Sequence, residues 1–170
     1  FGPRHRLLLV GAGQLAAHLS TLALAMDYEV MLADSREWAL DQWQGPDVEK
    51  ILGLPDDVVR EHATDEHCAV ITLSHDPRVD DMALMEALDS ASWYVGALGS
   101  VRTTEKRIQR LSQLGLGCDA LARLHAPVGL SIGSKTTMEI AVSIMAQLTQ
   151  LRRESKDLRQ TAQAAEVGTR

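Results

Sequence analysis

Three loops rich in glycine and small polar residues carry the side chains best suited to bind a ligand. They are Gly11–Ala16, Tyr94–Ser100 and His125–Thr136. Small residues let the backbone approach a ligand closely, and the chemistry that such loops support is the binding of an anionic group by N–H donors. The first two loops follow apolar runs, and the third precedes a long helical pattern. We expect all three to line one crevice at the same edge of a sheet.

The first loop matches the dinucleotide fingerprint, because Gly11-x-Gly13-x-x-Ala16 lies directly between a strand pattern and a helix pattern. In that fingerprint the glycines allow a tight turn and a close approach to a pyrophosphate. Asp34 ends the next strand about 20 residues later, where an acid hydrogen-bonds a ribose hydroxyl. Arg36 can accept a 2′-phosphate, but Asp34 would repel one, so the pattern favours a dinucleotide without that phosphate. The alternative is that the glycines serve only helix packing.

Ser74-His75-Asp76-Pro77 follows a strand that borders the same crevice in a doubly wound sheet. Adjacent residues of an extended chain point in opposite directions, so these polar side chains are not expected to form a nucleophilic triad. Ser74 or Asp76 can cap the turn before Pro77. His75 can equally contact a ligand or donate a proton to it.

Gly96, Gly99 and Ser100 precede a helix whose first turn offers free N–H groups, with Arg102 alongside. That combination suits an anionic oxygen, and the alternative is a simple serine cap. The remaining charges of this helix, as far as Arg110, are expected to be solvated.

Gly129, Gly133 and Lys135 form a similar glycine-containing loop before the last helix, where it could bind an anion. The lysine adds a positive charge on a flexible side chain. The two glycines are one residue too close for the nucleotide-binding pattern Gly-x-x-x-x-Gly-Lys-Ser/Thr. The histidines outside these loops have no metal-ligand spacing, and we predict no metal site.

The composition is that of a globular protein and argues against several classes of function. Of 170 residues, 45% are hydrophobic, and the net charge of −6 argues against binding to the nucleic-acid backbone. Cys68 and Cys118 form no Cys-x-x-Cys pair, so neither a disulfide framework nor a zinc site is expected. No apolar stretch approaches the roughly 20 residues that span a bilayer, and no signal-peptide pattern is present. We therefore predict a cytoplasmic protein.

Apolar runs alternate with helical patterns along the chain. The predicted strands cover 6–10, 29–33, 48–52, 68–73 and 93–95, and the predicted helices cover 14–26, a segment from 55, 80–88, 100 or 103 to about 114, and 137–153. This alternation predicts an α/β fold, a Rossmann-like, doubly wound, mostly parallel sheet with helices on both faces. Residues 1–154 are predicted to form one domain, and the polar tail 155–170 is predicted to be disordered.

Taken in order, these loops resemble the Rossmann domain of the XdhC/CoxI family over residues 7 to 153. That family contains accessory proteins for molybdenum hydroxylases such as xanthine dehydrogenase and carbon monoxide dehydrogenase. The most specific part of the resemblance is His-Ala-Pro-Val-Gly-Leu-Ser-Ile-Gly at 125–133, which a general dehydrogenase is not expected to have. The other parts are Gly11-Ala-Gly13, Asp34-Ser-Arg36, Ser74–Pro77, Tyr94–Ser100, Glu139-Ile-Ala141 and Ser143-Ile144.

The resemblance implies a protein that binds molybdenum cofactor, either molybdopterin or its nucleotide form. We expect it to be non-catalytic, because its loops suit the binding of anions but supply no acid, base and nucleophile set. Such a protein hands the cofactor to an apo molybdenum hydroxylase after sulfuration by a cysteine desulfurase. Backbone N–H groups at Gly13 and Gly99 and the charge of Lys135 are then expected at the phosphate or nucleotide end, and His75, Asp76 and His125 at the pterin or metal end. The predicted cofactor-binding residues are Gly11, Gly13, Gln14, Asp34, Arg36, Ser74, His75, Asp76, Gly96, Gly99, Ser100, Arg102, His125, Pro127, Gly129, Gly133 and Lys135.

Two departures from the family pattern bear on this prediction. The family usually continues Gly-Leu-Asp-Ile-Gly-Ala, with a proline and two acids at the start of the last helix. This chain has Ser131, Ser134, Thr137 and Met138 in this stretch, so a carboxylate contact is missing. Many members also have an amino-terminal domain with cysteines, which this chain would have as a separate polypeptide or lack. The alternative functions are an NAD(P)-dependent oxidoreductase and a nucleotide-sensing regulatory module. The apolar stripe of the last helix is a possible homodimer face.

Overall fold

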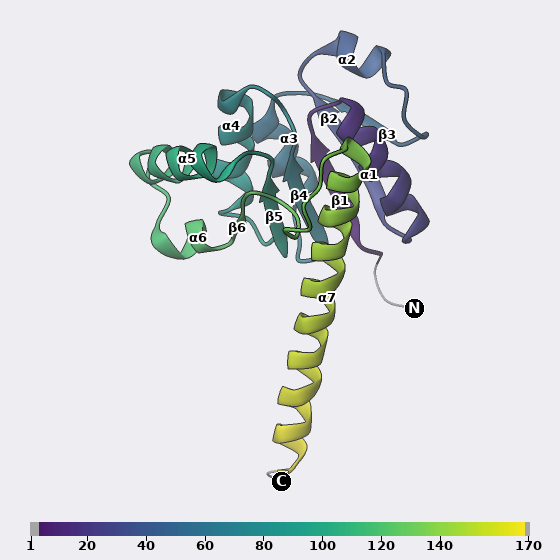
Figure 1. Ribbon diagram of the computed structural model, residues 1–170. Coiled ribbons are helices and arrows are strands. Elements are labelled where there is room, and N and C mark those ends of the chain that lie inside the picture. The colour runs from purple at the N-terminus through teal and green to yellow at the C-terminus, as the bar shows by residue number, and fades with distance from the viewer. Residues whose placement is uncertain (1–3, 169–170) are drawn as a thin grey trace.

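Two continuous apolar runs, β1 (Arg6–Val10) and β4 (Cys68–Thr72), form the centre of a six-stranded parallel sheet. The structure is a computed structural model that describes residues 4–168. The strand order is β3-β2-β1-β4-β5-β6, which places the reversal of order between β1 and β4 (Figure 1). The outer strands are β2 (Glu29–Asp34), β3 (Glu49–Leu52), β5 (Tyr94–Ala97) and β6 (Leu124–His125).

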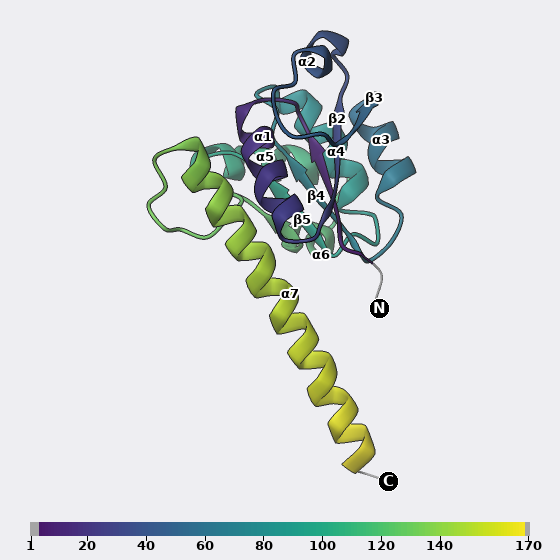
Figure 2. The ribbon, with the colours of Figure 1, turned by 90° about the vertical axis from the view of Figure 1, so that its right-hand side faces the viewer.

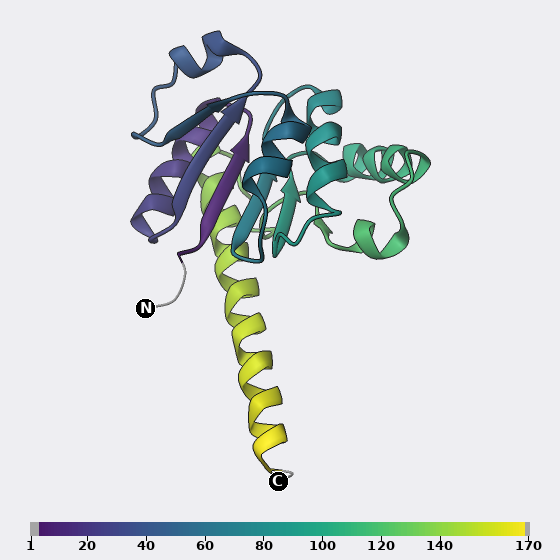
Figure 3. The ribbon, with the colours of Figure 1, turned by 180° about the vertical axis from the view of Figure 1, so that it is seen from behind.

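Helices cover both faces of the sheet. Alternate residues of β1 are therefore buried against two different helical layers. Leu7 and Leu9 pack with α1 (Gln14–Ala25) and the first half of α7 (Thr137–Gly168). Leu8 and Val10 pack with the opposite layer, which contains α3 (Pro55–His62), α4 (Pro77–Ala87) and α5 (Val101–Gln113) (Figures 2 and 3). This arrangement confirms the predicted Rossmann-like, doubly wound sheet.

Three short elements lie outside the prediction, namely α2 (Glu37–Asp41), α6 (Cys118–Ala122) and β6. With five or fewer residues, each is too short to produce a periodic pattern. Their positions still matter, because β6 places His125 beside β5 and α2 carries Trp38 near the start of α1.

Helix α7 continues to Gly168, whereas the sequence predicts a disordered tail from residue 155. Residues 153–168 are exposed and project from the body of the molecule (Figure 1). Arg, Glu, Lys, Gln and Ala dominate this stretch and favour helix even without packing partners. The domain limit at residue 154 stays a prediction. Within residues 4–168, none of the helices combines the length and apolarity that crossing a membrane requires.

Candidate functional site

The strand register brings three chain segments together at the carboxyl edge of the sheet. Val10 pairs with Ala33 on β2 and with Thr72 on β4. The residues that follow these three are Gly11, Asp34 and Leu73, and they are therefore neighbours across the edge. In doubly wound folds, ligands bind at this edge where the strand order reverses.

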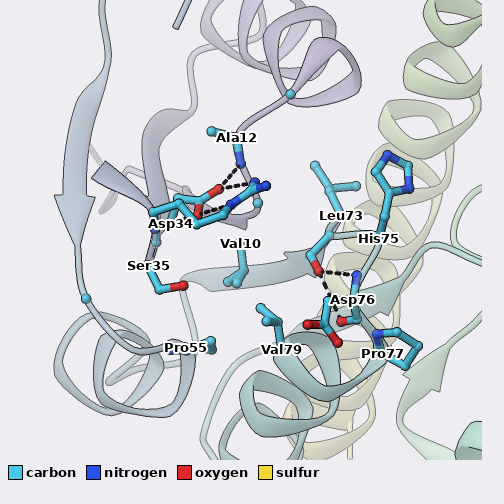
Figure 4. Close-up of a pocket in the computed structure, with 16 residues that line it drawn as sticks. Val10, Ala12, Asp34, Ser35, Pro55, Leu73, His75, Asp76, Pro77 and Val79 are labelled. Atoms are coloured by element: carbon cyan, nitrogen blue, oxygen red, sulfur yellow. Dashed lines mark hydrogen bonds and ion pairs between the residues drawn. The ribbon is translucent and has the colours of Figure 1, made fainter. Parts of the chain in front are cut away.

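A cleft of about 470 Å³ opens at that point. Figure 4 shows side chains from the ends of β1, β2 and β4 around it, with residues from the starts of α3 and α4 on one side. Seven of the predicted site residues line the cleft, namely Gly11, Gly13, Asp34, Arg36, Ser74, His75 and Asp76. The other nine lining residues were not among the predicted site residues, and most are small or apolar and bear no chemical signal of their own: Val10, Ala12, Ala33, Ser35, Gly53, Pro55, Leu73, Pro77 and Val79.

The two glycines of the first loop differ in what surrounds them. Gly11 has a φ of +118°, and a Cβ there would lie 2.8 Å from the backbone nitrogen of Ser74. Its lack of a side chain therefore serves the packing of this loop against the loop after β4. A Cβ at Gly13 would meet no atom within 4 Å. Of the two, Gly13 alone leaves open space in front of the backbone.

Helix α1 begins at Gln14, and its N-cap residue, Gly13, provides no side-chain cap. The other helices that start beside the predicted loops do have a side-chain cap. Asp76 caps α4 by accepting from the Arg78 N–H, and Ser100 caps α5 by accepting from the Thr103 N–H. Helix α3 also starts beside this cleft without a side-chain cap, but its first turn carries Asp56 and Asp57, which disfavour an anion. The first turn of α1 has no acid, so the α1 start is the better place for an anionic group to accept from backbone N–H donors.

The carboxylate of Asp34 is held tightly at the end of β2 and is only 6% exposed. Its oxygens accept from the Ala12 N–H at 2.9 Å and from the backbone and guanidinium of Arg36, also at 2.9 Å. Burial acts to raise the pKa of Asp34, but the hydrogen bonds from Arg36 and Ala12 outweigh it and leave the pKa below its ordinary value. Asp34 is thus an anion that binds the glycine loop to the segment after β2.

The loop after β4 is braced by its own polar groups. The Ser74 hydroxyl accepts from the Asp76 N–H at 2.9 Å and donates to the Asp76 carbonyl at 3.1 Å. Hydrogen bonds from the backbone and side chain of Arg78 lower the pKa of Asp76. These contacts match the capping interpretation of Ser74 and Asp76, while His75 lines the cleft.

A buried ion-pair cluster lies beneath this loop, and the sequence does not predict it. Arg107 is 2% exposed, although the α5 charges were expected to be solvated, so that expectation is wrong at this position. Its guanidinium lies 3.5 Å from Asp80 and 3.3 Å from Asp81, and it donates to the Leu98 carbonyl at 3.2 Å. Asp80 in turn accepts from the Ser74 N–H at 3.2 Å. The cluster therefore connects the loops after β4 and β5.

The two later loops pack against helices and do not line this cleft. In the third loop, a Cβ at Gly129 would lie 2.5 Å from the Ser143 hydroxyl of α7, and the ring of His125 stacks on Tyr94 with centroids 4.7 Å apart. Gln147 of α7 accepts from both the Tyr94 hydroxyl, at 2.5 Å, and the Gly129 N–H, at 3.0 Å. These contacts give the His-Ala-Pro segment a packing role.

The start of α7 is satisfied by a capping box. The carboxylate of Glu139 accepts from the Lys135 and Thr136 N–H groups at 3.1 and 2.9 Å, and the Thr136 hydroxyl accepts from the Glu139 N–H at 3.1 Å. These hydrogen bonds lower the pKa of Glu139. A carboxylate therefore lies where the sequence suggested an anionic ligand.

The remaining predicted residues lie away from the main cleft. They are Gly96, Gly99, Ser100, Arg102, Pro127 and Gly133. Gln14 lines a second cleft, which adjoins the first at Ala12 and Gly13. Across residues 4–168, no group of three or more His, Cys, Asp or Glu side chains is placed to hold a metal ion.

Comparison with known proteins gives a consistent match. The family described as the XdhC Rossmann domain matches residues 7–148. A Bacillus subtilis (strain 168) protein named as a probable subunit of xanthine dehydrogenase is 27% identical over 152 residues, with 89% of this chain and 44% of that protein covered. The molybdenum cofactor insertion chaperone PaoD of Escherichia coli (strain K12) is 34% identical over 88 residues, 52% of this chain and 28% of PaoD.

Among solved structures, a protein from Bacillus halodurans described as a xanthine dehydrogenase superposes with a TM-score of 0.76 at 33% identity. The match covers 89% of this chain and 44% of that one. The chain therefore spans less than half the length of each of these relatives.

Proposed function

Because the chain belongs to the XdhC family as its Rossmann domain, we propose that it binds molybdenum cofactor and assists its insertion into a molybdenum hydroxylase. The names of two relatives support this proposal, since one is a probable subunit of xanthine dehydrogenase and the other a molybdenum cofactor insertion chaperone. The client is an apo-hydroxylase such as xanthine or carbon monoxide dehydrogenase, and a cysteine desulfurase is a second partner. The setting proposed is the cytoplasm, with residues 1–154 as the folded unit.

The uncapped start of α1 is the observation that carries the proposal. A pterin cofactor ends in a phosphate, and the Gly13 backbone offers N–H donors at a helix start with no Cβ in front of them. Asp34 fixes the loop by accepting from the Ala12 N–H, so the donors are held in place before the ligand arrives. His75 and Ser74 line the neighbouring wall of the cleft.

The chain acts in this proposal by holding and releasing the cofactor. The bound cofactor supplies the redox chemistry, which the client hydroxylase uses. The residues of the cleft position the phosphate and cover one side of the ligand. Ser74 and Asp76 are hydrogen-bonded to the backbone of their own turn, and we assign them no step of bond making.

Calorimetric titration under anaerobic conditions tests this proposal. The chain is titrated with molybdenum cofactor and, separately, with NAD⁺ and NADH. Binding of molybdenum cofactor that Gly13→Val abolishes supports the proposal. Gly117→Val is the matched control, since Gly117 also precedes a helix and has no atom within 4 Å of its Cβ position. Binding of a dinucleotide alone contradicts it.

A nucleotide-sensing module is the second candidate, and the position of Asp34 at the end of β2 favours it. A carboxylate at that place binds ribose hydroxyls in dinucleotide-binding domains. Here Arg36 occupies the same oxygens, so a ribose can bind only after the guanidinium moves. The titration with NAD⁺ and NADH separates the two candidates.

A further inference from the structure

The second cleft has a volume of about 560 Å³ and lies between the start of α1 and the segment around α2. It shares Ala12 and Gly13 with the first cleft, so the backbone of this turn borders both. Figure 2 shows α2 standing beyond the end of the sheet, above the start of α1. The other lining residues are Gln14, Ala17, His18, Trp38, Ala39, Gln42, Trp43 and Gln44.

Two tryptophans border this cleft in a chain with only three Trp, two Tyr and one Phe. Trp38 is 57% exposed, which is unusual for the largest apolar side chain. The guanidinium of Arg36 lies over its ring, 4.8 Å from the centroid. Arg36 therefore covers one face of the Trp38 ring, and a ligand can stack only on the other face.

Trp43 has a different role, because its ring is fixed. Its Nε1 donates to the Pro46 carbonyl at 2.8 Å, and a Cβ at Gly45 would lie 2.3 Å from the ring. The backbone of Gly45 thus packs directly on the indole. This packing holds the segment that carries Trp38 and the two following glutamines.

The polar side chains of the second cleft are chiefly carboxamides. Gln14, Gln42 and Gln44 line it, together with His18, while its lining contains no Asp, Glu, Lys or Arg. Each carboxamide offers donors and an acceptor side by side, which matches the edge of a neutral heterocycle. A cationic ring such as oxidised nicotinamide would find no carboxylate here to balance its charge.

We propose that the second cleft binds the planar ring of the phosphate-bearing ligand whose phosphate lies at Gly13. Trp38 stacks on the ring, and the glutamine amides bond its edge. The ring we assign carries a 2-amino-4-oxo pyrimidine edge, which pterin and guanine share. That edge presents two hydrogen-bond donors and one acceptor. It can therefore form hydrogen bonds with more of the three glutamine amides than the edge of adenine can. This assignment rests on the proposed function, because it requires that the phosphate of the same ligand lies at Gly13.

Titration of the full chain with four probes tests the assignment. The probes are neopterin monophosphate, guanosine 5′-monophosphate, adenosine 5′-monophosphate and inorganic phosphate, followed by calorimetry and tryptophan fluorescence. We expect the first two to bind roughly tenfold more tightly than the adenosine compound. Trp38→Ala weakens them by about tenfold, since base–aromatic stacking contributes on that scale, while the affinity for inorganic phosphate is unchanged.

Trp38→Phe keeps a stacking ring and restores most of the affinity. Trp93→Phe is the control, because Trp93 lies outside this cleft. Tighter binding of neopterin monophosphate points to a pterin as the natural source of the ring, and tighter binding of the guanosine compound points to a nucleotide.

Two results overturn the assignment in distinguishable ways. If Gly13→Val abolishes binding but Trp38→Ala leaves every affinity unchanged, the ring subsite is wrong and the phosphate site of the proposed function stands. If the wild-type chain binds none of the four probes, the phosphate site and the ring subsite are both wrong.

Discussion

Arg36 donates three of the four hydrogen bonds that the Asp34 carboxylate accepts. Two come from its guanidinium and one from its backbone, and the fourth comes from the Ala12 N–H. The side chain of Arg36 is 47% exposed, whereas that of Asp34 is 5% exposed. A solvated cation therefore covers a fixed, buried anion at the edge of the cleft.

Arg36→Ala is expected to raise the pKa of Asp34 toward its ordinary value, because two donors to the carboxylate are lost. NMR titration of the carboxyl carbon measures this change. The wild-type pKa is lowered, so the pair stabilises the fold above pH ~4 and loses that effect as pH falls through the native pKa. The loss of stability at neutral pH is about 1 kcal/mol, because the guanidinium is half exposed. An unchanged pKa would show that the pair does not form in solution.

Gly11→Ala is expected to destabilise the fold by about 2–4 kcal/mol. Its φ of +118° is strained for any side chain, and the added Cβ would lie 2.8 Å from the Ser74 nitrogen. Gly13→Ala is the matched control, with open space at the Cβ position and an expected cost below about 1 kcal/mol. Urea denaturation compares the two. Equal losses would mean that the close contact between the two loops relaxes freely.

Asp80→Asn is expected to change the pH dependence of stability. Burial raises the pKa of Asp80 to about 7 despite the nearby Arg107 guanidinium. Between the unfolded pKa near ~4 and that value, the folded state holds a proton that the unfolded chain has released. The wild type therefore loses stability relative to the variant as pH rises from about 4 to about 7, at up to ~1.4 kcal/mol per pH unit.

Denaturation curves collected at half-unit steps of pH measure this difference. Asp89→Asn, which alters an exposed carboxylate just after α4, is the control. A difference between Asp80→Asn and the wild type that does not change with pH would mean that Asp80 stays charged across this range.

Glu139→Ala is expected to lower the thermal stability of the fold, because it removes the acceptor for the Lys135 and Thr136 N–H groups at the start of α7. Thermal unfolding followed by circular dichroism measures the loss. Glu154→Ala, on the exposed part of the same helix, serves as the comparison. A similar loss from both variants would show that the capping box adds nothing beyond helix propensity.

The central strands and the first loop could be predicted from the sequence, since their signals are local. A continuous apolar run ending in Gly11 and an acid ending the next strand, Asp34, identify the β1–α1–β2 unit without any tertiary information. The same holds for the cap at Ser100, which is one of two alternatives that the sequence leaves open and which the structure shows accepting from Thr103.

Other features depend on distant contacts and leave no local signal. The burial of Arg107 results from its position over Asp80 and Asp81, which lie a helix and a strand away. The position of Trp38 beside the second cleft could not be predicted, because α2 is a single short turn with no periodicity. Glu139 forms a recognisable capping box with Thr136. Gly133 and Lys135, which precede it, indicate an anion-binding site more strongly than a capped helix.

Helix α7 has a consequence for how the chain reaches its native state. Ile144 and Leu148 belong to the same buried cluster as Leu7, Leu9 and Leu19, which are more than 120 positions earlier in the chain. During synthesis, one side of β1 and α1 therefore stays exposed to solvent until almost all of the folded unit has emerged. Parallel sheets completed by such distant contacts fold slowly. The nascent chain thus passes through a long interval in which chaperone binding and aggregation compete with folding.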